Sequence, residues 1–157
     1  MANATVITIT DSIVKMSVGD TEPPDWDAAT GVETFSCQVA TAAINATPNL
    51  ADVPATFCQP ATQVPAASSY EVAITALQDW TDVAGLSMFL FDNETKLGWV
   101  QLSIPTNDVG DAIAVATAQV RFVAGSFGGE AGTPLQFDVV LPVQGRPAIA
   151  QATVPTP

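Results

Sequence analysis

The most regular feature of the chain is an alternation of apolar and polar residues in its second half. In the segment 70–76 the larger apolar side chains occupy every second position, and the same period of two returns in the segments 99–104, 114–123 and 135–141. Successive side chains of a strand point to opposite faces of a sheet, so this pattern predicts antiparallel strands with one apolar and one mildly polar face. We therefore expect a mainly β protein, with an antiparallel β-sandwich or barrel-like fold.

The first half of the chain shows the same pattern in shorter pieces. The segments 6–10 and 13–18 are typical of strands, and 35–43 is a further strand for which 55–59 is a short candidate partner. Turn-prone residues separate these pieces, as an antiparallel arrangement requires.

One segment departs from the period of two. Its apolar residues are three and four positions apart, which places them on one face of a helix: Val83, Leu86, Phe89 and Leu90. Asp82 stands before them and is suited to cap the first turn. We predict one short helix over about residues 82–92, lying against a sheet.

The glycine-rich segment 125–132 separates two predicted strands. It lacks the Lys-Ser or Lys-Thr that follows a phosphate-binding loop, and it leads into a strand instead of a helix. We expect it to be the tip of a hairpin.

Two segments are candidates for contacts between subunits. Residues 45–69, called the arm below, contain four prolines among small and apolar residues, so we expect an extended segment without interior strands that packs on another subunit. The candidate contact residues of the arm are Pro48, Pro54, Phe57, Pro60 and Pro65. The acidic, proline-containing loop 19–27 carries Trp26, whose indole we expect to be covered by a nearby sheet face or by a neighbouring subunit.

A length of 157 residues suits one domain spanning 1–157, with 151–157 as a flexible C-terminal tail. Sixteen acidic residues, four basic residues and no histidine give a formal net charge of -12. Binding to nucleic acid by charge neutralisation is excluded, because phosphate contacts require clustered Lys and Arg. A charge of this size is typical of a soluble, self-repelling surface.

Residues for catalysis are scarce. Without histidine, a serine or cysteine triad of the usual form is excluded, and the carboxylate pairs all fall in predicted turns. The best candidate for calcium, Asn107-Asp108-Val109-Gly110-Asp111, lacks the full spacing of a calcium loop. We expect no enzyme activity, no metal and no cofactor.

Cys37 and Cys58 lack the paired spacing of a zinc site. The chain start has no cationic region, and no stretch reaches the roughly 18–20 apolar residues that would span a bilayer. We therefore expect synthesis in the cytoplasm, no membrane insertion, and two reduced, buried thiols in preference to a disulfide.

Residues 70–150 carry a series of short motifs in a characteristic order. They are Gln78-Asp79-Trp80, Gly85-Leu86-Ser87-Met88-Phe89-Leu90-Phe91, Gly98-Trp99-Val100, Gly125-Ser126-Phe127-Gly128-Gly129, and Leu141-Pro142-Val143-Gln144-Gly145-Arg146-Pro147. In order and spacing these motifs resemble the major tail proteins of long-tailed, non-contractile bacteriophages. The resemblance implies a tail-tube fold with one flanking helix, and hexameric rings that stack into a tube within the virion tail. It also implies a tape-measure protein and other tail proteins as partners, and passage of DNA without specific binding.

If the chain forms such a tube, some of its polar strand faces line the channel. Alternation selects five candidates for this face: Glu71, Gln101, Ser103, Gln136 and Asp138. Like charge on the wall and on the DNA would prevent arrest of the DNA within about one Debye length, roughly 8–10 Å.

Two other classes fit parts of the pattern. A carbohydrate-binding or adhesive β-sandwich would use Trp26, Trp80 and Trp99 as stacking platforms for sugars, but it would normally carry an export signal. A capsid decoration or tail-terminator protein shares the viral context and the small β fold, and forms a different assembly.

Overall fold

The fold is taken from a computed structural model, which describes residues 13–27, 30–35, 37–104 and 112–153. Its elements are β1 (Ile13–Val18), β2 (Glu33–Thr34), β3 (Val39–Val53), β4 (Thr62–Leu77), α1 (Leu86–Asp92), β5 (Leu97–Ile104), β6 (Ala112–Arg121), β7 (Gln136–Pro142) and β8 (Ala148–Thr153). The strand expected at 6–10 and the calcium candidate at 107–111 lie outside the described residues.

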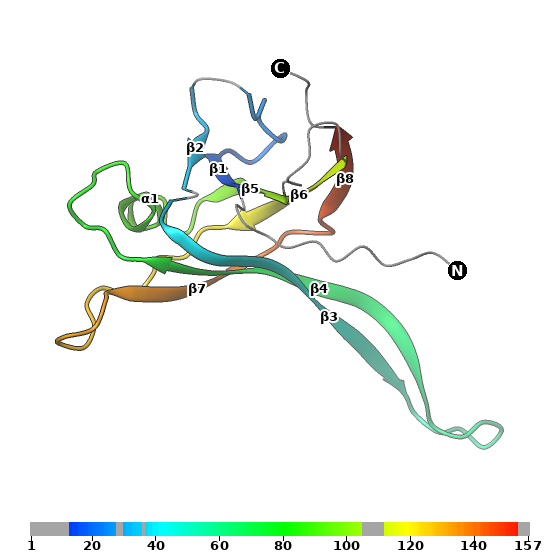
Figure 1. The fold of residues 1–157 in the computed structure, drawn as a ribbon. Coiled ribbons are helices and arrows are strands. Elements are labelled where there is room, and N and C mark those ends of the chain that lie inside the picture. The colour runs from blue at the N-terminus through cyan, green and yellow to red at the C-terminus, as the bar shows by residue number, and fades with distance from the viewer. Residues whose placement is uncertain (1–12, 28–29, 36, 105–111, 154–157) are drawn as a thin grey trace, which may run out of the picture.

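The strands form two antiparallel sheets (Figure 1). One has five strands in the order β2-β1-β5-β6-β8, and the other has three in the order β3-β4-β7. The prediction of a mainly β, sandwich-like fold with one short helix is confirmed. The described strands remain two separate sheets and do not close into a barrel.

The core lies between the two sheets, as the alternation predicted. Every second residue of β7 and of the last part of β4, from Val72 to Ala76, is buried, and so are alternating residues of β1, β5 and β6 that face them. The core residues from these five strands are Val14, Met16, Val72, Ile74, Ala76, Val100, Leu102, Ala118, Val120, Phe137, Val139 and Leu141. Leu86 and Leu90 of α1 complete it, together with the rings of Phe35 and Phe122.

The helix is shorter than predicted, because its first turn is capped from a distant part of the chain. α1 begins at Leu86, whose N–H donates to the side-chain oxygen of Gln38 at 2.6 Å. Asp82 does not cap it: its carboxylate accepts the N–H of Ala84 within the preceding turn. Val83 is therefore outside the helix and 83% exposed, against the expectation that it shares the buried face.

The arm is also more regular than predicted. Its residues continue β3 and β4 into a long two-stranded hairpin that projects beyond both sheets (Figure 1). Residues 55–59, expected to be a strand, form the closing turn, in which Thr56 and Gln59 make an isolated bridge. The expectation of an extended segment is correct, but the expectation that it forms no ladder is wrong.

The glycine-rich segment 125–132 is not a hairpin tip. β6 and β7, which it connects, belong to different sheets, so the segment carries the chain from one layer of the sandwich to the other. Gly128 and Gly132 both have positive φ, which explains why glycine is suited to this crossing. Beyond β7, Val143 makes a bridge to Val120 of β6 and joins the layers again.

Two strands were not predicted. β2 is only Glu33–Thr34, too short to show a period, and β8 is rich in alanine, which is uncommon in strands. β8 includes residues 151–153, so the last strand continues into the segment expected to be a flexible tail.

Candidate functional site

The residues predicted to line a channel fall into two groups on opposite sides of the sandwich. Glu71, Gln136 and Asp138 alternate with buried residues of β4 and β7, so they lie on the outer face of the three-stranded sheet. Gln101 and Ser103 alternate with buried residues of β5, so they lie on the outer face of the five-stranded sheet. The two sheets pack against each other through their inner faces, so their outer faces point in opposite directions. A channel can therefore be lined by only one of these two groups of residues.

The outer face of the three-stranded sheet, called the acidic face below, carries the carboxylates of Glu71 and Asp138. Thr75 and Asp138 are cross-strand partners, and the Thr75 hydroxyl donates to the Asp138 carboxylate at 2.5 Å. Glu71 lies on the same face of β4, opposite Pro142 at one end of the ladder with β7. No Lys or Arg occurs in β3, β4 or β7. The electrostatic potential of this face therefore disfavours contact with phosphates.

The outer face of the five-stranded sheet differs in charge. Gln101 lies between Lys15 of β1 and Thr117 of β6 in the register, and β6 ends at Arg121. The presence of cations in these strands makes this face the weaker candidate for a surface along which DNA slides.

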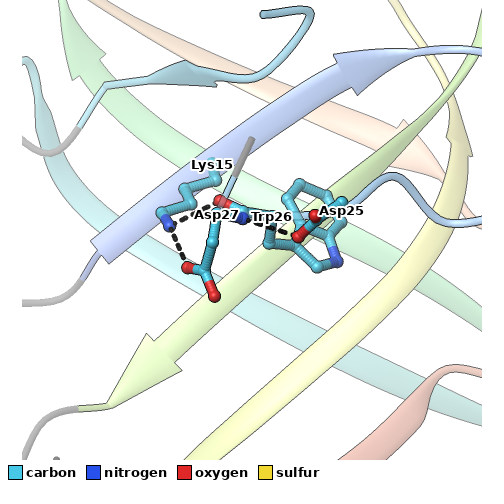
Figure 2. Close-up of polar contacts among 4 residues, drawn as sticks. All are labelled: Lys15, Asp25, Trp26 and Asp27. Atoms are coloured by element: carbon cyan, nitrogen blue, oxygen red, sulfur yellow. Dashed lines mark hydrogen bonds and ion pairs between the residues drawn. The ribbon is translucent and has the colours of Figure 1, made fainter. Parts of the chain in front are cut away.

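Trp26 lies in a loop that Lys15 holds against β1 (Figure 2). The ammonium of Lys15 donates to the Trp26 carbonyl oxygen at 2.9 Å and lies 3.9 Å from the Asp27 carboxylate. Asp27 is 98% exposed, so this ion pair contributes little to stability, and the bond to the carbonyl is the stronger tie. Trp26 is half-buried within the single chain, and a contact of its exposed part with another subunit stays a prediction.

The prolines of the arm occupy positions where a hairpin tolerates a missing N–H. Pro48 lies at a register shift between Thr47 and Asn49, and Pro65 is the partner of Leu50 in a section of β4 that has lost its contact with β7. Pro54 and Pro60 flank the closing turn. Proline is accepted at bulges, strand ends and edges because no ladder bond is lost there.

The closing turn of the arm presents a large aromatic side chain to solvent. Phe57 is fully exposed, with a relative accessibility of 111%, and Leu50 along the arm is 60% exposed. Asn49 stabilises the hairpin through a bond from its side-chain amide to the Ala67 carbonyl at 2.8 Å. The arm thus holds Phe57 away from its own core.

Both cysteines are exposed, so the expectation that they are buried is wrong. Cys37 precedes β3 and Cys58 lies in the closing turn of the arm. The 15 residues of β3 separate them, and at about 3.3 Å per residue this distance is far beyond the reach of a disulfide within one chain.

In the turn before α1, two bonds from Thr81 displace the pKa of the Asp79 carboxylate from its ordinary value. The Thr81 hydroxyl donates to Asp79 at 2.7 Å and the Thr81 N–H donates at 3.0 Å. These bonds, the hydroxyl first, hold the pKa of Asp79 below its ordinary value of 3.8, because they stabilise the charged form. The arrangement is a local turn, which accounts for Asp79 without a catalytic role.

Sequence reasoning missed an apolar cleft between the sheets. The cleft has a volume of about 560 Å³ and lies between β3 on one side and β5, β6 and β8 on the other. We call it the inter-sheet cleft and define it by Ala42, Ile44, Leu102, Ile104, Ala116 and Ile149. The one available signal was Ile149, an isolated large aliphatic residue among alanines in an unpredicted strand.

Within the described ranges, no three His, Cys, Asp or Glu side chains lie close enough together to hold a metal ion. Among the same residues, no helix has the length and apolar character needed to cross a membrane.

Comparison with known proteins adds no assignment to these surfaces. No model of a protein family matches the sequence, and a search of curated proteins finds no significant relative.

Proposed function

We propose that this chain is a structural subunit of a bacteriophage tail tube and not an enzyme. In this proposal its copies close into hexameric rings, the rings stack into a tube of the virion tail, and the acidic faces line a channel for DNA. The motifs in residues 70–150 support membership of the tail-tube family. The difference in charge between the two outer faces supports an orientation of the subunit with its acidic face toward the channel.

The observation that carries the proposal is the incompleteness of the three-stranded sheet. Among the described strands, β3 and β7 each pair on one side only, with β4 between them. Unpaired strand edges attract other strands, and proteins generally cover, shorten or pair them. Joining β3 of one copy to β7 of the next would satisfy both edges through a heterologous contact that closes into a ring.

The strand count of such a ring suits a channel. Six copies with three strands each give roughly 18 strands, similar to barrels of 16–18 strands that enclose an aqueous pore. At about 4.8 Å between strands and a tilt near 40°, the backbone diameter is on the order of 35 Å. The side chains of the acidic face would point into this space.

The arm supplies the second contact that a tube needs, between one ring and the next. A two-stranded hairpin alone is marginally stable in water, so a long projecting one gains stability by packing on a neighbour. The resemblance to tail proteins also makes a tape-measure protein and other tail proteins the proposed partners. In this proposal DNA passes through the channel without specific binding.

The adhesive alternative draws no support from the tryptophans. All three tryptophans are half-buried: Trp26, Trp80 and Trp99. The indole N–H of Trp80 donates to the side-chain oxygen of Gln78 at 2.9 Å, and its ring packs edge-on against Phe127. A sugar-binding platform requires an exposed ring face.

Assembly of the purified protein tests the proposal. Negative-stain microscopy and sedimentation velocity over a range of concentrations are expected to show rings or tubes that increase with concentration. A strictly monomeric protein at every concentration would overturn the proposal, and binding to a glycan array by that monomer would favour the adhesive alternative.

A shortened arm separates folding from stacking. Thr47 and Ser69 are cross-strand partners, so replacing residues 48–68 by Asn-Gly closes the hairpin with a two-residue turn. This variant is expected to keep the circular dichroism spectrum of a folded β protein and to stop at single rings or monomers. Tubes of normal length from this variant would show that the arm is not the stacking contact.

A further inference from the structure

The inter-sheet cleft exists because the two sheets differ in width. Ile149 of β8 is the partner of Ala116, which lies on the same side of β6 as the buried Ala118 and Val120. Ile149 therefore faces the interior side of its sheet, yet it is 76% exposed. The three-stranded sheet does not extend far enough to cover β8, so an interior position is left open to solvent.

The surface of the cleft is mainly apolar and carries no charged side chain. None of its lining residues is Asp, Glu, Lys or Arg. Its volume of about 560 Å³ is within the range of roughly 300–1,000 Å³ that is typical of pockets able to enclose a compact apolar group. An aromatic side chain is a group of this kind.

The tip of the arm offers such a group. Phe57 is fully exposed at the end of a hairpin whose residues 45–69 include a single charged residue, Asp52. The Asp52 carboxylate accepts a bond from the Gln63 side chain at 2.8 Å across the two strands. The tip itself, residues 54–60, is therefore uncharged, and Asp52 is the single charge on its flanks.

Phe57 cannot reach the cleft of its own chain. Ile44 of the cleft belongs to β3, and the chain continues in β3 from Ile44 to Val53, a rise of roughly 30 Å at about 3.3 Å per residue. Pairing with β4 prevents this strand from folding back, and the arm points away from both sheets (Figure 1). The occupant must come from another molecule.

The proposed self-assembly supplies a second copy as that molecule, and charge selects these two surfaces for the contact. Each copy carries a formal charge of -12, so copies repel one another wherever acidic surfaces meet. Contact is least opposed where both surfaces lack charge, which is the case for the arm tip and the cleft. Each chain carries one tip and one cleft, so the contact is heterologous and can propagate from copy to copy.

We propose that the arm of one copy inserts Phe57 into the inter-sheet cleft of a second copy, against Ile44 and Ile149. This inference rests on the proposed self-assembly and names the receptor of the arm. It also explains the exposure of Phe57 and of Ile149 by one contact, in which the two side chains meet.

A native thiol allows the contact to be tested directly. Cys58 is adjacent to Phe57 and exposed, so Ile149→Cys combined with Cys37→Ser leaves one thiol at the tip and one at the cleft. Oxidation of the assembled protein with copper phenanthroline is expected to produce covalent dimers and higher ladders on non-reducing gels. Peptide mapping should show the link between Cys58 and the introduced cysteine.

Val83→Cys in the same Cys37→Ser background is the matched control, because Val83 is similarly exposed, at 83%, and lies in the turn before α1. It is expected to give few cross-links. Equal cross-linking by both variants would overturn the inference, since it would indicate random collision.

A second measurement uses the aromatic side chain. Phe57→Ala is expected to raise the concentration needed for tubes at least tenfold, and Phe57→Leu is expected to retain most of the assembly. Normal tubes from Phe57→Ala together with no cross-link to position 149 would overturn the inference while the tail-tube proposal stands. Monomers from the parent protein would overturn both.

Discussion

At Gly98 an aromatic ring packs directly on the backbone of a strand. A Cβ at this position would lie 2.3 Å from Cε2 of Phe122 and 2.4 Å from the carbonyl oxygen of Ser17. Phe122 is in turn packed edge-on against Phe89 of α1, with 5.3 Å between ring centroids. The absence of one side chain thus allows the helix and the five-stranded sheet to share a closely packed aromatic core.

Gly98→Ala is expected to lower the free energy of unfolding by about 3 kcal/mol, because neither the ring nor the backbone carbonyl can move without disturbing the core. Urea denaturation followed by tryptophan fluorescence measures the change. Gly19→Ala is the control, since a Cβ there meets nothing within 4 Å, and it is expected to change stability by less than about 0.5 kcal/mol. Equal effects of the two substitutions would contradict the close approach at Gly98.

The Asp79 turn gives a prediction about titration. Its folded pKa is depressed, so its contribution to stability is present above the ordinary value of 3.8 and is lost as the pH falls through the lower folded value. Thr81→Val removes the hydroxyl donor, and the pKa of Asp79 is expected to rise toward 3.8. Carbon-detected NMR titration of the carboxyl group measures it. Thr81→Ser keeps the donor, and identical titrations of the Val and Ser variants would refute this cause.

At the scale of elements, the sequence correctly predicted the strands whose position follows from a local alternation of apolar and polar residues. The strands around 13–18, 99–104, 114–123 and 135–141 were placed within a few residues, because an alternating pattern is a property of the strand itself. The arm was not recognised as a ladder, because its prolines lower strand propensity locally. Pairing with a long partner strand and a bulge at Pro48 compensate for that loss.

The start of α1 shows why the rest could not be predicted. Asp82 is of a residue type that is suited to cap a helix, yet the N–H of Leu86 is bound by Gln38, which is brought there only by the tertiary fold. In the same way, alternation identified which residues face away from the core, but not that Gln101 and Asp138 lie on opposite sides of the sandwich. That fact depends on which sheet each strand joins.

Gln38→Ala is expected to destabilise the protein by about 1–2 kcal/mol, because it leaves the first N–H of a buried helix end without its acceptor. Asp82→Ala changes an exposed residue whose bond is confined to a turn, so a loss of less than about 0.5 kcal/mol is expected. Thermal unfolding by circular dichroism compares the two variants. A larger loss for Asp82→Ala would show that the helix depends on the local cap after all.

At the scale of the whole molecule, the two outer faces differ where it matters for a tube. Among the described strands both sheets have free edges, but the three-stranded sheet has carboxylates on its outer face and no cation in its strands, whereas the five-stranded sheet carries Lys15 and Arg121. Edge pairing through the three-stranded sheet would therefore direct the acidic faces inward and leave the mixed faces outside. The strand edges that pair between copies would then also determine which sheet lines the channel.

Two identical substitutions on opposite faces test this orientation. Gln136 lies on the acidic face and Gln101 on the outer face of the five-stranded sheet. Tubes of Gln136→Lys are expected to retain short double-stranded DNA in a nuclease-protected form that salt releases, because each ring then places several ammonium groups around the channel. Tubes of Gln101→Lys gain the same charge, and any DNA they bind should remain open to nuclease. Protection by the Gln101→Lys tubes alone would reverse the orientation, and the five-stranded sheet would then line the channel.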